Sequence, residues 1–249
     1  MASIDLRNVT VEFPIYNVSS RMLKKRFLRL ATGGSVFKDT NERVVIRSLD
    51  NISLSLQHGD RIGLVGHNGA GKSTLLRLLA KIYEPTFGHI KIDGHVSSML
   101  DLMQCVEHEA SGRENILMRG IISGLTKKES LRQVEEISDL TGLGDFLNMP
   151  ARTYSTGMLA RLAFAISSSI NPEILLIDEV FGTGDADFLE KARKRMISLL
   201  NVSSIVVMTS HSEEIIRQFC NKALVLANGF IQYAGSVDEA FQFYASTIN

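Results

Sequence analysis

Residues 66 to 73 (GHNGAGKS) form a short glycine-rich segment that ends in a lysine and a serine. The segment fits the pattern GxxxxGK[ST] at every required position. An apolar stretch from Arg61 to Val65 precedes it. A stretch with helical periodicity, Ser73 to Tyr83, follows it, and the turn-forming residues 84 to 86 are expected to end that helix. This order of strand, glycine-rich turn and helix predicts a phosphate-binding loop.

Each residue type in this loop suits the binding of a phosphate chain. Glycines let the backbone wrap closely, so that N–H groups point at phosphate oxygens, and the positive end of the helix faces the same anion. Lys72 would bridge the terminal phosphates, and Ser73 would ligate Mg²⁺ with Thr74 nearby. An incidental glycine-rich turn is the weaker alternative, because both the pattern and its flanking elements agree. The predicted nucleotide contacts in this segment are Gly66, Asn68, Gly69, Gly71, Lys72, Ser73 and Thr74.

A second apolar stretch, Ile174 to Ile177, ends in two carboxylates, Asp178 and Glu179. In an open α/β sheet, ligands bind at the carboxyl ends of the strands. Asp178 would therefore hold Mg²⁺, directly or through water, and Glu179 would polarise an attacking water. The alternative is that the two carboxylates cap the following helix.

Two further segments carry polar groups at the end of a predicted strand or at the start of a predicted helix, where a phosphate could bind. His211 follows the apolar stretch 205 to 208, where it could hydrogen-bond a terminal phosphate; a structural or solvated histidine is the alternative. Ser155 and Gly157 lie in YSTGM, directly before a helical stretch that begins at Leu159. They would offer a hydroxyl and a backbone N–H to a second anion site. The residues alone favour a simple N-cap at this position.

Composition limits the class of protein. There are 27 Lys+Arg and 27 Asp+Glu residues, which argues against a general nucleic-acid binder. The longest apolar run has five residues, whereas a membrane-spanning helix needs about 20. Asp5 and Arg7 stand where a signal peptide would be apolar, and Cys105 and Cys220 have no CxxC spacing. We therefore expect a soluble intracellular protein without a disulfide framework or a structural zinc site.

The order of elements predicts an α/β core, a helical insert and a second α/β stretch. The insert covers about residues 97 to 169, and Thr126 with Glu129 predicts the start of one of its helices. The short apolar stretches 174 to 177 and 205 to 208 are typical of central strands in a parallel sheet. Other strands are expected at residues 4 to 13 and 52 to 56.

Taken together, these motifs resemble the nucleotide-binding subunit of an ATP-binding-cassette (ABC) transporter. The family has the same order of glycine-rich loop, signature, acidic strand end, aspartate loop and switch histidine. Here these are residues 66–73, 154–158, 174–179, Gly184 with Asp185, and His211. The resemblance covers essentially the whole chain. It implies a P-loop NTPase fold of the α/β class, with a mainly parallel sheet core, an antiparallel β subdomain and a helical subdomain insert.

The resemblance also implies domain bounds and residue roles. A single nucleotide-binding domain would cover 1–249, with its catalytic core at about 1–96 and 170–249 and its helical subdomain at about 97–169. The chain would bind ATP and Mg²⁺ and hydrolyse ATP in a head-to-tail homodimer. Ser155 and Gly157 of one subunit would contact the ATP held by the other. The implied catalytic residues are Lys72, Glu179 and His211, the metal ligands Ser73 and Asp178, and a further nucleotide contact Asp185.

Departures from the common pattern narrow the subgroup. The usual LSGGQ signature is here YSTGM, followed by RLAFA at 161 to 165. Together with SGREN at 111 to 115, this form is similar to subunits that export O-antigen, capsule or teichoic-acid polysaccharides. That similarity implies a separate transmembrane permease, a lipid-linked polysaccharide substrate and a peripheral position on the cytoplasmic face of the membrane. No nucleic-acid partner is expected. Many such subunits carry a carbohydrate-binding domain after the cassette, and because this sequence stops at Asn249, none is expected here.

Some assignments stay open at this level. The exported substrate could instead be a lipo-oligosaccharide or a drug, and a soluble, non-transport cassette protein is a more distant alternative. Adenine could stack on Tyr16 or Phe13, and Tyr16 is the preferred residue. Gln104 is the candidate for coupling to the permease, with an uncertain register. The basic segment 21 to 29 could contact the membrane, line a substrate entry or be a solvated face.

Overall fold

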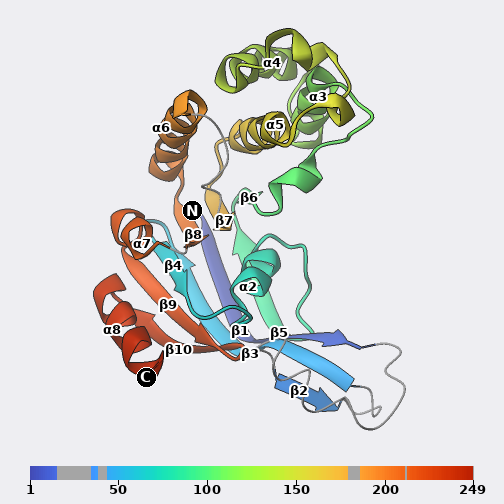
Figure 1. The fold of residues 1–249 in the computed structure, drawn as a ribbon. Coiled ribbons are helices and arrows are strands. Elements are labelled where there is room, and N and C mark those ends of the chain that lie inside the picture. Colours follow the sequence, from blue (N-terminus) through green and yellow to red (C-terminus); the bar gives the residue numbers. More distant parts are fainter. Residues whose placement is uncertain (16–34, 39–43, 179–185, 211, 249) are drawn as a thin grey trace. The chain divides into compact units, whose positions relative to one another are not determined.

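The computed structural model describes residues 1–15, 35–38, 44–178, 186–210 and 212–248 (Figure 1). Tyr16, the basic segment 21–29, Glu179, Asp185 and His211 lie outside the described residues, so their predicted roles stay predictions. The chain forms two compact units. The β-rich unit comprises Met1–Val96, Leu176–Glu179 and Ser204–Asn249. The helical unit comprises Ser97–Leu175 and Val180–Ser203.

Two sheets organise the strands of the described chain. One has the order β2-β3-β1-β5, and its strands pair in antiparallel fashion. Its members are β1 (Ser3–Pro14), β2 (Ser35–Lys38), β3 (Val44–Gln57) and β5 (Phe87–Asp93). The other sheet has the order β10-β9-β4-β8-β7-β6. Its members are β4 (Arg61–Val65), β6 (Val96–Met99), β7 (Ile174–Asp178), β8 (Ile205–Thr209), β9 (Lys222–Ala227) and β10 (Phe230–Gly235).

The centre of the second sheet is parallel, as the apolar stretches predict. Strand β4 pairs in parallel with β8 on one side and with β9 on the other. Every residue of β8 is buried, and so are the first four residues of β7. Strands buried on both faces read as continuous apolar runs rather than as alternating ones. The predicted strands at 174–177 and 205–208 are therefore confirmed as interior strands of this sheet.

The helices in the described part of the β-rich unit are α2 (Lys72–Leu79), α7 (Glu213–Phe219) and α8 (Val237–Ile248). The first of them ends earlier than the sequence predicts. The helix was expected to reach Tyr83, but Lys81 has φ 59°, and the N–H of Ile82 bonds to the carbonyl of Arg77 at 2.9 Å. This is a Schellman end, which usually has glycine at the left-handed position. Because a lysine stands there, the sequence carries no signal for the stop.

The helical unit contains α3 (Gly112–Ile122), α4 (Lys127–Thr141), α5 (Thr156–Ser168), α6 (Ala186–Val202) and the short 3₁₀ helices η1 (Leu102–Cys105), η2 (Gly144–Asn148) and η3 (Ala151–Thr153). The predicted start at Thr126 is confirmed, since Thr126 and Glu129 form a complete capping box at α4. Ser111 and Glu114 form another at α3. The core of this unit packs α5 residues such as Leu162 against α3 and α4. In the described part of the chain, no helix is long and apolar enough to cross a membrane.

Candidate functional site

The glycine-rich loop leaves β4 at Gly66 and enters α2 at Lys72. At two positions only glycine fits. Gly66 has φ 152°, and a Cβ atom there would collide with the carbonyl oxygen of Leu226. Gly71 has φ 109°, and its Cβ would lie 2.8 Å from the carbonyl oxygen of Ser48. These close approaches hold the loop against neighbouring backbone, which fixes the direction of its N–H groups.

The N-terminus of α2 favours the binding of an anion. Gly71 is the N-cap residue, and its carbonyl accepts the first helical hydrogen bond from Leu75 at 2.9 Å. The N–H groups of the first helical residues have no acceptor within the helix, and the helix dipole adds positive potential at the same end. Lys72 folds back over the loop, where its Nζ donates to the carbonyl oxygens of Gly66 at 2.5 Å and His67 at 3.0 Å. The Lys72 ammonium and the positive end of the helix dipole therefore meet at one place.

A hydroxyl pair ties this helix to the antiparallel sheet. Ser48 on β3 and Thr74 on α2 have their side-chain oxygens 2.7 Å apart. Either oxygen can be the donor. The carbonyl of Ser48 also lies close to Gly71 and Gly229. Ser48 was not predicted, because nothing in its local sequence links it to Thr74, 26 positions away.

Asp178 lies at the same edge of the sheet as the loop. It ends β7, and its Oδ1 accepts a hydrogen bond of 2.6 Å from the hydroxyl of Thr209, the last residue of β8. Thr209 pairs in register with Leu64, two residues before the glycine-rich loop begins. The segment between Asp178 and α6, which begins at Ala186, lies outside the described residues, so the alternative that the two carboxylates cap this helix is not tested. Thr209 is the second residue that sequence reasoning missed, although its place at a strand end was a usable signal.

The signature residues lie in the helical unit. Ser155 is the N-cap of α5, and its Oγ accepts a hydrogen bond of 3.2 Å from the N–H of Met158. The capping alternative is thus realised, and contact with a nucleotide stays a prediction. A Cβ at Gly157 would meet only the Ser155 hydroxyl, at 3.9 Å. The surface beside this helix start is therefore open. The preceding Tyr154 is buried and donates to the carbonyl of Phe146 at 2.5 Å, while burial raises the pKa of its phenol.

Two further predicted contacts can be placed. Gln104 is exposed on η1. This short helix begins after Asp101, which has a left-handed conformation with φ 47°. Phe13, the alternative adenine contact, is half-buried on β1, and its ring packs edge-to-face against Tyr83 with 5.2 Å between the centroids. Neither observation tests the predicted role, so both roles stay predictions.

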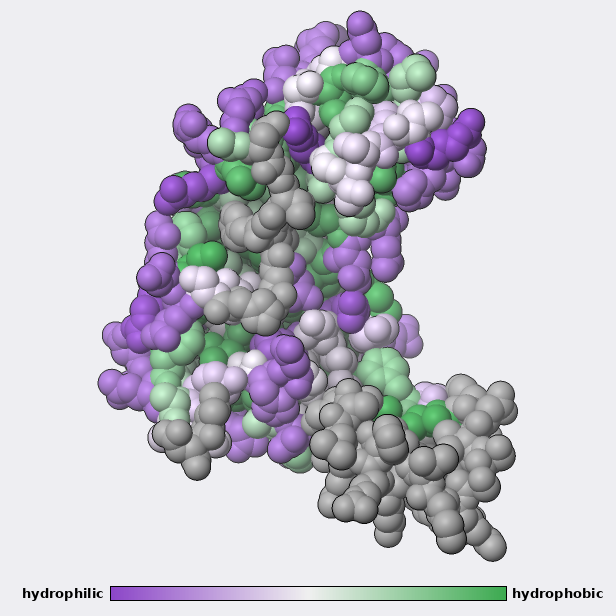
Figure 2. All heavy atoms as spheres, viewed as in Figure 1, coloured by the Kyte–Doolittle hydropathy of each residue, from purple (hydrophilic) through white to green (hydrophobic). Residues whose placement is uncertain are grey.

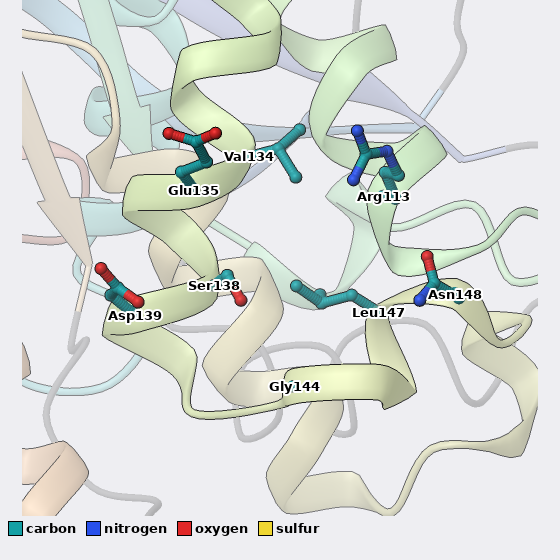
Figure 3. Close-up of a pocket in the computed structure, with 8 residues that line it drawn as sticks. All are labelled: Arg113, Val134, Glu135, Ser138, Asp139, Gly144, Leu147 and Asn148. Atoms are coloured by element: carbon teal, nitrogen blue, oxygen red, sulfur yellow. The ribbon is translucent and has the colours of Figure 1, made fainter.

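A separate pocket of about 250 Å³ lies in the helical unit (Figure 3). It contains none of the predicted site residues. Leu147 and Val134 supply its apolar lining, and charged groups come from α3 and α4. The residues that line it are Arg113, Val134, Glu135, Ser138, Asp139, Gly144, Leu147 and Asn148.

Comparison with known proteins identifies the family. The model of the ABC transporter family matches residues 49–182. The O-antigen export system ATP-binding protein RfbE of Yersinia enterocolitica is 45% identical over 238 residues, which are 96% of this chain and 99% of that protein. The chain belongs to the ABC transporter family. This confirms the family resemblance drawn from the glycine-rich loop, the signature and the acidic strand end.

Other relatives and solved structures agree with this family. The teichoic acids export ATP-binding protein TagH of Bacillus cereus is 34% identical over 97% of this chain, which spans 42% of that protein. The structure of a dimeric post-hydrolysis state of the cassette MJ0796 bound to ADP and Pi has a TM-score of 0.69, covers 94% of this chain and 98% of its own, and is 20% identical. The structure of an ATP binding subunit of an ABC transporter has a TM-score of 0.72, with 97% and 93% coverage and 17% identity. The predicted α/β P-loop NTPase fold is confirmed.

Proposed function

We propose that this ABC family member is the ATP-hydrolysing subunit of an exporter for an O-antigen-like polysaccharide. The observation that carries the ATPase assignment is the sheet edge where Lys72 folds over the glycine-rich loop and Asp178 ends a nearby strand. The exported class rests on the similarity to proteins named for O-antigen and teichoic-acid export. Export of a lipo-oligosaccharide or a drug is the nearest alternative.

In this proposal the glycine-rich loop binds the phosphate chain of ATP. Backbone N–H groups from Gly69 onward and the Lys72 ammonium neutralise the β- and γ-phosphates, and Asn68 and Thr74 add side-chain contacts. Lys72 now donates to two loop carbonyls, so it exchanges these bonds for phosphate oxygens when ATP binds. Tyr16 or Phe13 stacks on the adenine.

Ser73 and Asp178 suit a bound Mg²⁺. Both offer oxygen ligands, which this hard cation prefers, and Mg²⁺ usually takes only one or two protein carboxylates together with substrate phosphates. One oxygen of Asp178 is held by Thr209, which leaves the second for the metal or its water. When bound, the metal would neutralise charge on the phosphates. Glu179 polarises the water that attacks the γ-phosphorus, and His211 hydrogen-bonds the γ-phosphate, giving ADP and phosphate.

The remaining motif residues contact a second copy of the chain or the membrane permease. Ser155 and Gly157 contact the ATP bound to a second copy of the chain, and the open surface beside Gly157 leaves room for it. Asp185 completes this interface. Gln104, exposed on η1, transmits the nucleotide state to a separate membrane permease that carries the lipid-linked polysaccharide. The subunit lies on the cytoplasmic face of the membrane.

Replacing Glu179 by glutamine is expected to trap a dimer with two bound ATP molecules. The amide keeps the shape of the side chain but no longer polarises water, so ATP binds and is not cleaved. Size-exclusion chromatography with light scattering at millimolar ATP should show the dimer for Glu179→Gln and mostly monomer for the wild type. A Glu179→Gln protein that stays monomeric with saturating ATP contradicts either the dimer or the role of Glu179.

The exported class is tested by the membrane protein that accompanies this chain. Affinity purification of the tagged chain from membranes of its own organism should recover a polytopic permease, and loss of the chain should leave lipid-linked polysaccharide inside the cell. Recovery of a ribosome or a DNA complex would instead support a non-transport cassette. Accumulation of a lipo-oligosaccharide would support the alternative substrate.

A further inference from the structure

The end of the helical hairpin formed by α3 and α4 exposes two adjacent isoleucines. Ile121 is 58% exposed and Ile122 is 76% exposed. Leu131 on the first turns of α4 is 38% exposed. Lys127, Lys128 and Arg132 are exposed as well. We call these six residues the α3–α4 tip: Ile121, Ile122, Lys127, Lys128, Leu131 and Arg132.

Packing places these residues at one end of the hairpin. The two helices approach closely, because a Cβ at Gly120 would lie 2.9 Å from the Cβ of Ser130. A short turn joins them, with the N–H of Leu125 bonded to the carbonyl of Gly120 at 3.0 Å. Gly124 in this turn has nothing within 4 Å of its Cβ position, so the turn projects into open space. Figure 2 shows apolar surface among strongly hydrophilic groups where α3 and α4 lie.

Two of the three cations of the tip, Lys127 and Lys128, are not placed to stabilise α4. Lys127 and Lys128 are the first two residues of that helix, where the helix dipole disfavours positive charge. Neither lysine forms an ion pair within the described ranges of the chain. The nearest acid, Glu129, accepts hydrogen bonds from the hydroxyl and N–H of Thr126, which lower the pKa of its carboxyl. Its carboxylate is therefore held at the helix cap.

We propose that the α3–α4 tip docks on the surface of a bilayer that contains anionic lipids. Ile121 and Ile122 enter the boundary between headgroups and acyl chains, and Lys127, Lys128 and Arg132 bind lipid phosphates. Exposed apolar side chains beside cations are the combination that interfacial membrane anchors use. This inference goes beyond the proposed ATPase function and does not depend on nucleotide.

A lipid surface fits this tip better than a second copy of the chain does. In a symmetric contact the same patch would face itself, which would bring six cations together. A projecting turn can also insert into a deformable lipid surface without needing a matching groove on a partner protein. Binding to the permease is the remaining alternative, and experiments with pure lipid vesicles separate it from lipid binding.

A tryptophan at the tip provides a direct test, because the chain contains no tryptophan of its own. In full-length Ile122→Trp, the emission should shift to shorter wavelength with vesicles of phosphatidylglycerol and phosphatidylcholine, but not with phosphatidylcholine alone. The matched control is Ile82→Trp in the β-rich unit, where Ile82 is 57% exposed. The control should show no shift with either vesicle. A blue shift that needs no vesicles and grows with protein concentration would indicate self-association and overturn the proposal.

Vesicle sedimentation gives the second measurement. Lys127→Gln with Lys128→Gln should bind the anionic vesicles about thirtyfold more weakly than the wild type, since each lysine near the surface contributes about 1 kcal/mol. Lys191→Gln with Lys194→Gln makes the same change in net charge on α6 and should bind like the wild type. Thermal unfolding and ATP hydrolysis of both variants should stay at wild-type values.

Each other outcome contradicts the proposal that the α3–α4 tip binds anionic lipid. Equal binding by the wild type and Lys127→Gln/Lys128→Gln would assign membrane association to another part of the chain, such as residues 21–29. No binding of the wild type to the vesicles would overturn lipid binding and favour contact of the tip with the permease. If the lysine variant fails to fold, Ile121→Ser with Ile122→Ser repeats the comparison, and unchanged binding there overturns the proposal.

Discussion

Replacing Lys72 by alanine is expected to lower ATP hydrolysis by about a hundredfold or more, because the charge proposed to neutralise the terminal phosphates would be lost. The Nζ of Lys72 lies over the loop, at 2.5 Å from the carbonyl oxygen of Gly66. Alanine leaves the backbone donors of the loop in place. Nucleotide affinity should therefore fall less than the rate of hydrolysis. Steady-state phosphate release at saturating Mg²⁺ and ATP measures the effect.

The folded state should tolerate this change. The carbonyl of His67 also accepts a bond from the N–H of Ala70 at 3.1 Å, so it keeps one partner without the lysine. The unfolding temperature without nucleotide should stay close to the wild-type value, while the stabilisation that ATP gives should shrink. Lys72→Met, which keeps the apolar stem, should behave in the same way.

A surface lysine supplies the matched control. Lys91 is exposed and forms an ion pair with Asp93 at 3.0 Å, an interaction of a kind that contributes little to stability. Lys91→Ala should hydrolyse ATP at the wild-type rate. Wild-type hydrolysis by Lys72→Ala, with Lys91→Ala unchanged, would show that the glycine-rich loop is not the site of phosphate binding.

The sequence predicted those parts of the site that depend on local structure. The glycine-rich loop, the apolar strands and the capping box at Thr126 each need residue types at fixed short spacings, and such spacings can be recognised in one sequence. Strand β8 is an example, since an unbroken apolar run is what burial on both faces requires. These elements appear in the structure close to the predicted bounds.

The missed residues depend on contacts between distant segments. Thr209 matters because β7 and β8 are neighbours, which brings its hydroxyl to Asp178 across 31 positions of sequence. Ser48 meets Thr74 for a similar reason, because β3 lies against α2. The early end of α2 was missed for a different reason. Lys81 adopts a left-handed conformation, which cannot be predicted from a lysine because glycine is the usual residue at such a position.

Replacing Asp178 by asparagine is expected to reduce Mg²⁺-dependent hydrolysis by about a hundredfold or more, because the proposed metal site would lose its charged protein ligand. The amide oxygen can still accept the bond from Thr209, so the strand ends should stay in place. A titration of activity with Mg²⁺ at fixed ATP should show a higher metal requirement as well as a lower maximal rate. A normal metal requirement would exclude Asp178 from the metal site.

Thr209 should also affect Mg²⁺-dependent ATP hydrolysis, because it positions Asp178. Thr209→Val keeps the shape of the side chain but leaves Oδ1 of Asp178 without its donor, which should lower stability by about 1–3 kcal/mol and lower the rate by about tenfold. Thr209→Ser keeps the hydroxyl and should retain most of the activity. In the Asp178→Asn background, Thr209→Val should cost little further activity, because the group that it orients is already disabled. Full additivity of the two losses would mean that Thr209 contributes to packing of β8 and not to the position of Asp178.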